Sequence, residues 1–161
     1  EGKGSEFYFT IEFPIGALEP KPEKTKNDHF LEHMNFILAE DNDLNAEIAI
    51  ELLKMQGAAV KRAENGKQAL DLFLESSPGE YQAVLMDIQM PVMDGLEACR
   101  AIRSQNRADA AEIPVIAMTA NTFKEDADAA ADAGMNGFVT KPVDVEYLYQ
   151  VLASLIQPKK Y

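Results

Sequence analysis

Residues 83–95 read AVLMDIQMPVMDG: a short apolar run, an aspartate, and a loop that contains proline and glycine. Four successive apolar residues, 83–86, are typical of a strand that is buried on both faces of a sheet. The proline and the glycine favour a turn after this strand, and an apolar helical pattern follows over residues 96–103. Asp87 is therefore expected at the carboxyl end of a buried strand.

The same succession of strand and helix recurs along the chain. Five alternations within about 120 residues predict an α/β fold, with a doubly wound five-stranded parallel sheet and helices on both faces. The expected strands are residues 36–39, a short one around Val60, 83–86, 114–118 and 137–139. The expected helices are residues 45–55, with Ile48, Leu52 and Met55 on one face, a segment carrying residues 69–74, then 96–103, a segment ending at Ala133, and 146–156.

Polar residues stand where four of these strands end. Glu40 and Asp41 follow the first strand, Asp87 the third, Thr119 the fourth and Lys141 the fifth. In an open parallel α/β sheet, ligands bind outside the carboxyl ends of the strands. Three carboxylates, a hydroxyl and an ammonium group are therefore expected to gather at one edge of the sheet.

This set of groups has a clear chemical use. Carboxylate oxygens are hard ligands that suit Mg²⁺ or Mn²⁺. A cation among three carboxylates would offset their repulsion and let one of them attack a phosphoryl group. The lysine and the threonine would then hold the phosphoryl oxygens.

The chain resembles the receiver domain of two-component signalling proteins over roughly residues 35–157. The residues that carry the resemblance are Glu40-Asp41, Asp87 with Met90-Pro91 and Met93-Asp94-Gly95, Thr119-Ala120, and Lys141-Pro142. The resemblance implies the flavodoxin-like fold with strand order 2-1-3-4-5. It also implies Mg²⁺ (or Mn²⁺) as the cofactor and phosphorelay signal transduction as the function.

The resemblance implies a role for each acidic residue. Asp87 is the implied phosphoacceptor, taking a phosphoryl group from phosphohistidine. Asp41 would ligate the metal directly, as would Asp87, and Glu40 would do so through water. The backbone carbonyl of Gln89 would be a further metal ligand.

Other roles follow from the same resemblance. Lys141 would pair with the phosphoryl group, and its bond to Pro142 is typically cis in the family. Thr119 and Phe138 would form the conformational switch. Two residues, Gln89 and Asn121, would modulate how long the phosphoryl group survives hydrolysis.

The opening of the chain has a different composition. Residues 6–13 predict a strand, and residues 1–16 resemble the last strand of the ATP-binding domain of histidine kinases. Residues 17–34 have the composition of a linker, with two prolines and charges of both signs. We therefore expect a piece of a hybrid sensor histidine kinase: a kinase remnant, a linker, the receiver at residues 35–157 and a tail at 158–161.

Composition limits the partners. The chain has 27 acidic and 15 basic residues and a net charge of −12, without a basic cluster, which argues against binding nucleic acid. No apolar run approaches the roughly 20 residues that cross a membrane, and a single cysteine suits a reducing cytoplasm. The expected partners are a histidine kinase phosphodonor domain and a histidine phosphotransfer domain, with water as the other acceptor. Weak self-association, and membrane anchoring of the parent protein, are left open.

Two other functions use the same features. A haloacid dehalogenase-type phosphatase also has an aspartate nucleophile and Mg²⁺, but it needs a second aspartate where this chain has Gln89. An interaction module that never receives phosphate would not need the full set of polar strand ends. The pattern His29-x-x-Glu32-His33 fits a zinc motif, but it has no obvious third ligand. As a receiver, the chain is expected to catalyse its own phosphorylation and dephosphorylation.

Overall fold

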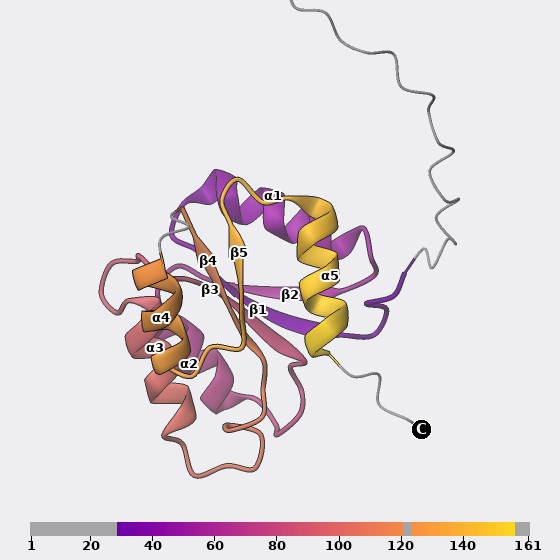
Figure 1. Ribbon diagram of the computed structural model, residues 1–161. Helices are drawn as coiled ribbons and strands as arrows, with labels where there is room; N and C mark the ends of the chain where they lie inside the picture. The colour runs from indigo at the N-terminus through magenta and orange to yellow at the C-terminus, as the bar shows by residue number, and fades with distance from the viewer. Residues whose placement is uncertain (1–28, 121–123, 157–161) are drawn as a thin grey trace, which may run out of the picture.

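The computed structural model describes residues 29–120 and 124–156, and it contains a five-stranded sheet flanked by helices (Figure 1). Strands and helices alternate as expected along the chain. The strands are β1 (Asn35–Ala39), β2 (Ala59–Ala63), β3 (Ala83–Asp87), β4 (Val115–Thr119) and β5 (Gly137–Thr140). The helices are α1 (Asp43–Lys54), α2 (Gly66–Glu75), α3 (Gly95–Arg103), α4 (Lys124–Asp132) and α5 (Val145–Leu155).

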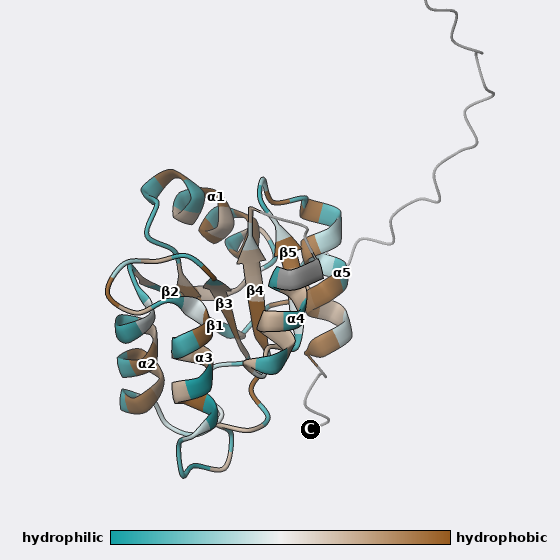
Figure 2. Cartoon of the chain, turned by 60° about the vertical axis from the view of Figure 1, so that its left-hand side comes forward, coloured by the Kyte–Doolittle hydropathy of each residue, from teal (hydrophilic) through white to brown (hydrophobic). Residues whose placement is uncertain are grey.

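All strand pairs are parallel, and the order across the sheet is β2-β1-β3-β4-β5. The predicted doubly wound fold and strand order are therefore confirmed. Helices α1 and α5 cover one face of the sheet, while α2, α3 and α4 cover the other (Figure 1). The hydrophilic and hydrophobic bands along α2 and α3 follow this division between solvent and sheet (Figure 2).

Burial along the strands depends on their place in the sheet. Every residue of β3 and β4 is buried, which agrees with their continuous apolar sequences. Strand β2 is an edge strand, and there exposed residues alternate with less exposed ones. The two faces of β1 supply both cores: Phe36 packs toward α1 and α5, whereas Ile37 packs toward α2 and α3.

Side-chain caps set where several helices begin. Helix α1 starts two residues earlier than expected because the Asn42 side chain accepts a hydrogen bond from the Asn45 amide. Asp94 caps α3 in a full capping box with Glu97.

The buried face of α1 differs from the expected one. The structure buries Ala46, Ala49 and Leu53, whereas Ile48 is 46% exposed and Met55 is 65% exposed. Two alanines on the inner face allow the helix to lie close to the sheet, whereas Leu52 is only partly buried against the core. The predicted inner face was therefore wrong for Ile48 and Met55, whereas Leu52 does pack against the core.

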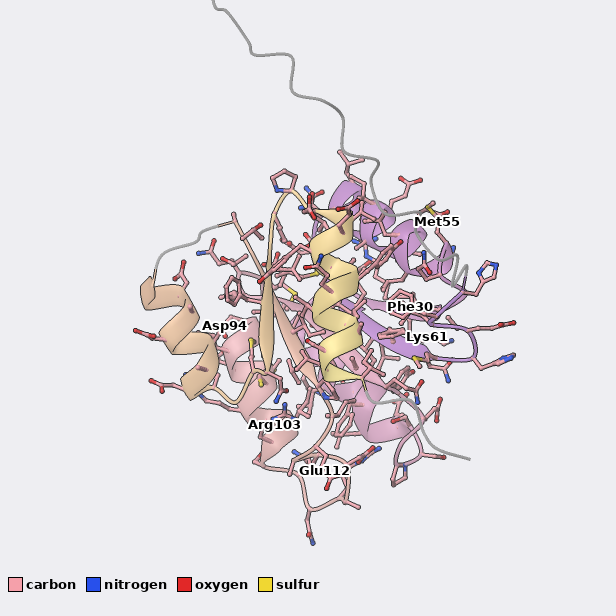
Figure 3. All side chains as sticks on the ribbon, turned by 45° about the vertical axis from the view of Figure 1, so that its right-hand side comes forward. Phe30, Met55, Lys61, Asp94, Arg103 and Glu112 are labelled. Atoms are coloured by element: carbon pink, nitrogen blue, oxygen red, sulfur yellow. The ribbon has the colours of Figure 1, made fainter. Side chains whose placement is uncertain are left out.

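The residues just before β1 pack against the domain. Leu31 is only 1% exposed and belongs to the core under α1 and α5. The Phe30 ring meets the Tyr149 ring edge-on at 5.6 Å between centroids (Figure 3). Phe30 and Leu31, which the prediction placed in the linker over residues 17–34, therefore pack against the domain. The kinase remnant predicted at residues 1–16 and the tail at 158–161 lie outside the described residues.

Candidate functional site

The predicted polar residues meet at the carboxyl edge of the sheet. Asp87 is the last residue of β3 and Thr119 the last of β4, while Lys141 follows β5 directly. They share a cavity of about 230 Å³ with Gln89 and other residues of the adjoining loops and helices. The lining residues are Asn45, Asp87, Ile88, Gln89, Thr119, Ala120, Asp126 and Lys141.

Lys141 joins two buried carboxylates. Its Nζ atom lies 2.6 Å from Asp87 Oδ2 and 2.6 Å from Glu40 Oε2. Glu40 is completely buried, and its other oxygen accepts hydrogen bonds from the Asn45 side chain at 3.2 Å and the Asn42 backbone at 3.3 Å. Both oxygens of Glu40 are thus held, which satisfies a charge that would otherwise be costly to bury.

Burial governs the acid–base properties of Asp87. Desolvation raises the pKa of this carboxyl group, and the repulsion from Glu40 adds to the effect. The hydrogen bond and charge of Lys141 and the backbone hydrogen bond from Gln89 act in the opposite direction, without cancelling the rise. The carboxylate is therefore more basic than an exposed aspartate, and a more basic carboxylate is generally a better nucleophile.

The pKa of Lys141 is also raised. Burial, the largest single influence, lowers it, but hydrogen bonds and charges from Asp87 and Glu40 together outweigh burial. Lys141 is therefore a fixed cation at neutral pH. It offers its charge between the two carboxylates and to any anion that enters the cavity.

Three carboxylates could hold a metal ion. Glu40, Asp41 and Asp87 each offer one oxygen, and these atoms all lie within 4.8 Å of one another. Asp41 is exposed whereas the other two are buried, so the group opens toward solvent on one side. Because hard oxygen donors with room for water suit Mg²⁺, the donor set fits this ion.

The loop after β3 folds tightly back on Asp87. A Cβ atom at Gly95 would lie 2.1 Å from the carbonyl oxygen of Asp87, so no other residue fits there without a backbone shift. The Gly95 amide donates to the Ile88 carbonyl at 2.9 Å, and the Gln89 amide donates to Asp87 Oδ1 at 3.1 Å. The glycine was noted as a turn residue, but its close contact with Asp87 was not foreseen.

The other predicted residues lie as follows. Thr119 is buried at the edge of the cavity, and Gln89 is exposed beside it. Phe138 is 43% exposed, and its ring lies 6.5 Å from that of Tyr147. The Lys141-Pro142 bond is cis, as expected. Asn121 lies outside the described residues.

Sequence reasoning missed three residues near the site: Asn45, Arg62 and Asp126. Asn45 stands one helical turn after the acidic pair, in the first turn of α1, and this spacing could have placed it at the same edge. Arg62 donates to the backbone carbonyl of Glu40. Asp126 lines the cavity from α4, and no signal in the sequence marked it.

The two histidines and the single cysteine lie outside the site. His29 and His33 are exposed, and neither belongs to a metal-binding group among the described residues, since the acidic group contains only the three carboxylates. Cys99 is buried, and burial raises the pKa of its thiol. In the described part of the chain, no helix combines the length and the apolar character that crossing a bilayer requires.

Comparison with known proteins identifies similar chains. The model of the response regulator receiver domain family matches residues 36–153. Hybrid signal transduction histidine kinase I of Dictyostelium discoideum is 40% identical over 122 residues, which cover 74% of this chain and 7% of that protein. The aerobic respiration control sensor protein ArcB of Escherichia coli is 38% identical over 148 residues, which cover 92% of this chain and 18% of ArcB. The chain thus spans less than a fifth of either relative.

Two solved structures are also similar. The receiver domain of sensor histidine kinase PA1611 from Pseudomonas aeruginosa, with magnesium coordinated in its active site cleft, is 33% identical, with a TM-score of 0.69. The match covers 76% of this chain and 96% of that one. The second is the co-crystal structure of the histidine phosphotransfer protein Ypd1 of Saccharomyces cerevisiae and the receiver domain of its response regulator Ssk1. The match to it has 30% identity and a TM-score of 0.69. That match covers 77% of this chain and 89% of the other.

Proposed function

The chain belongs to the response regulator receiver domain family, and on this basis we propose that Asp87 accepts a phosphoryl group from phosphohistidine. The observation that carries the proposal is the position of Asp87 in the cavity, bound to Lys141 and beside two further carboxylates. An Asp87 oxygen would attack phosphorus while the bond from phosphorus to the histidine nitrogen breaks. The products are an acyl phosphate and a neutral donor histidine, which takes up a proton where the phosphoryl group was bound.

The chain's own residues divide the work of the transfer. Lys141 would exchange its contact with Asp87 Oδ2 for a phosphoryl oxygen, since its ammonium group already lies in the cavity. The Gln89 amide holds the other oxygen of Asp87 at 3.1 Å and so orients the carboxylate. Thr119 would bind another phosphoryl oxygen, and its displacement would be passed to Phe138 as the conformational switch.

We propose that Mg²⁺, or Mn²⁺, binds at the acidic group. Asp41 and Asp87 would bind it directly, Glu40 through water, and the Gln89 carbonyl would add a ligand. When bound, the cation would neutralise charge on the carboxylates and on the phosphoryl oxygens. The magnesium ion in the similar PA1611 receiver supports this assignment.

The proposed partners are a histidine kinase phosphodonor domain and a histidine phosphotransfer domain. Support comes from the hybrid kinases among the relatives and from the complex of the Ssk1 receiver with Ypd1. Transfer of the phosphoryl group to water would compete with transfer to a protein partner. We propose that Gln89 and Asn121 modulate the rate of this hydrolysis. A location in the cytoplasm, where such partners would meet the receiver, is part of the same proposal.

We propose that the chain is a piece of a hybrid sensor kinase. The match to ArcB covers 92% of this chain, so about 13 residues fall outside it and it begins no later than about residue 14. The similarity therefore reaches well before the receiver match, which starts at residue 36. This supports a kinase remnant and a linker ahead of the receiver.

The test is labelling with acetyl phosphate and Mg²⁺, followed by mass spectrometry of the intact protein. The wild type should gain one phosphoryl group, and Asp87→Asn should gain none. Asp71→Asn, which removes a carboxylate from the surface of α2, should label like the wild type. Undiminished labelling of Asp87→Asn would refute the assignment, and steady release of phosphate from phosphate esters would favour a phosphatase of the haloacid dehalogenase type instead.

A further inference from the structure

Arg62 makes a set of contacts to the loop that carries the acidic pair. It lies on the edge strand β2, opposite Leu38 of β1. Its Nε and Nη2 atoms donate to the Glu40 carbonyl at 3.3 and 3.2 Å, and Nη2 also reaches the Asp41 carbonyl at 3.4 Å. One guanidinium group therefore contacts the backbone of both acidic residues.

We propose that Arg62 is a positioning residue for the metal site. Through these carbonyls it would hold the backbone of Glu40 and Asp41 in the geometry that binds the divalent cation. The inference rests on the proposed function, because it concerns the same acidic group. It adds a residue that touches neither metal nor phosphoryl group.

The need for such a contact follows from the course of the chain. The regular β1–β2 pairing ends at Ala39 and Ala63, and the Glu40 amide makes one more bond, to the Ala63 carbonyl. Beyond that point the backbone leaves the sheet to enter α1. The Glu40 side chain is held by Asn45 and Lys141, whereas the exposed Asp41 depends on its backbone for its position.

Arginine suits this task better than lysine. Its planar guanidinium group presents several donors in a fixed fork, whereas a lysine ammonium group is a point charge on a flexible stem. In this structure Nε and Nη2 both donate to the Glu40 carbonyl, and Nη2 also contacts the Asp41 carbonyl and the Asp43 carboxylate. A lysine at position 62 would keep the charge and lose the fork.

A simpler explanation is the ion pair between Arg62 and Asp43. Nη2 lies 2.7 Å from Asp43 Oδ1, but the Asp43 side chain is 91% exposed. Such a pair is screened by solvent and contributes little to stability. The contacts with the carbonyls are therefore the ones that distinguish Arg62 from an ordinary surface arginine.

If Arg62 acts only through its charge, or instead by positioning the loop, its removal should change the affinity for a divalent cation in opposite directions. By Coulomb's law, losing a positive charge near three carboxylates should strengthen binding of a divalent cation. Losing a positioning contact should weaken it, because supporting residues around a metal site typically contribute about tenfold or more to affinity. The sign of the change therefore separates the two explanations.

The experiment is a calorimetric Mg²⁺ titration of Arg62→Met, with Lys61→Met as the matched control. Lys61 is exposed on the other face of the same strand (Figure 3), so its substitution removes the same charge without touching the loop. We expect the dissociation constant for Mg²⁺ to rise about tenfold in Arg62→Met and to stay the same or fall slightly in Lys61→Met. Asp43→Asn should change it less than twofold.

A second readout uses the protein without metal. Amide hydrogen exchange over residues 40–43 should be faster in Arg62→Met than in the wild type, while exchange in β4 stays unchanged. Unchanged or tighter Mg²⁺ binding by Arg62→Met would overturn the inference, as would unchanged exchange.

If Arg62→Met does not fold, Arg62→Lys is the variant to measure: wild-type affinity for Mg²⁺ would overturn the inference, and weaker binding would support it. A wild type that binds no Mg²⁺ would instead refute the proposed function.

Discussion

The Nζ atom of Lys141 lies 2.6 Å from Asp87 Oδ2, although the two residues are 54 positions apart in the chain. The contact joins the end of β3 to the loop between β5 and α5, across the intervening strand β4. The same ammonium group also meets the buried Glu40. Lys141 is thus a structural counter-ion to two carboxylates as well as a candidate ligand of the phosphoryl group.

Lys141→Met should destabilise the metal-free protein. Removing the cation leaves Glu40 and Asp87 buried side by side without a counter-charge, and breaking such a group typically costs about 3 kcal/mol. Urea denaturation in the presence of a chelator measures the change in the free energy of unfolding. Lys67→Met, which removes a lysine from an exposed ion pair on α2, should cost less than about 0.5 kcal/mol. Equal losses in the two variants would contradict this account.

Asp87→Asn should be more stable than the wild type at neutral pH. The fold raises the pKa of Asp87, chiefly by burial, so the folded state binds its proton more tightly than the unfolded state does. The corresponding stability is complete below the unfolded pKa, about 4, and is lost as pH rises through the folded pKa. Asparagine does not titrate, so the variant does not lose this stability. In urea unfolding without metal, the free energy of unfolding of Asp87→Asn should exceed that of the wild type by an amount that grows from pH 4 to pH 7. An advantage that shrinks over this range would disprove the explanation.

Strand ends made most of the site predictable, because Asp87 and Thr119 end apolar runs typical of buried strands, and Lys141 directly follows the shorter, partly exposed β5. The supporting residues were less accessible. Arg62 lies on an edge strand, where an exposed arginine is the ordinary expectation, and nothing local reveals its contact with a carbonyl 22 residues away. Leu31 was assigned to the linker because the short apolar pair Phe30-Leu31, within a charged segment, shows no clear periodicity.

Gly95→Ala should disrupt the site and the fold together. A methyl group there would lie 2.1 Å from the Asp87 carbonyl oxygen, a backbone atom that cannot move without moving Asp87, the proposed phosphoacceptor. We expect a loss of about 3 kcal/mol or more in the free energy of unfolding, at the upper end of overpacking effects, together with loss of labelling by acetyl phosphate. Gly137→Ala is the control, since its methyl group would meet only the ends of the Leu155 and Val151 side chains, at 3.1 and 3.2 Å. A Gly95→Ala protein with normal stability and labelling would contradict the close contact.

Asp109→Asn tests a polar cluster at the opposite end of the sheet. The Arg107 guanidinium donates to both oxygens of Asp109, and this hydrogen bonding lowers the pKa of the carboxyl group. A lowered pKa contributes stability above the unfolded value, about 4, and that stability disappears as pH falls through the folded pKa. The variant should therefore be less stable than the wild type by about 1 kcal/mol at pH 7. Denaturant unfolding should show the two proteins converging below pH 4; a constant gap would point to packing instead of charge.

Leu31→Ala tests whether the segment before β1 belongs to the folded domain. The Leu31 side chain is buried among residues of α1 and α5, and truncating a buried leucine to alanine costs about 2–5 kcal/mol. Glu32→Ala, at the exposed neighbouring position, should leave the free energy of unfolding within about 0.5 kcal/mol of the wild type.

Truncation tests the same segment. A chain that starts at residue 35 should unfold at a lower urea concentration than one that starts at residue 29, because it lacks both Leu31 and the Phe30 contact with Tyr149. Equal midpoints for these two chains would place the segment in the linker after all. A lower midpoint would show that residues 29–34 belong to the folded domain, next to the amino end of β1 and at the edge of the sheet opposite to Asp87.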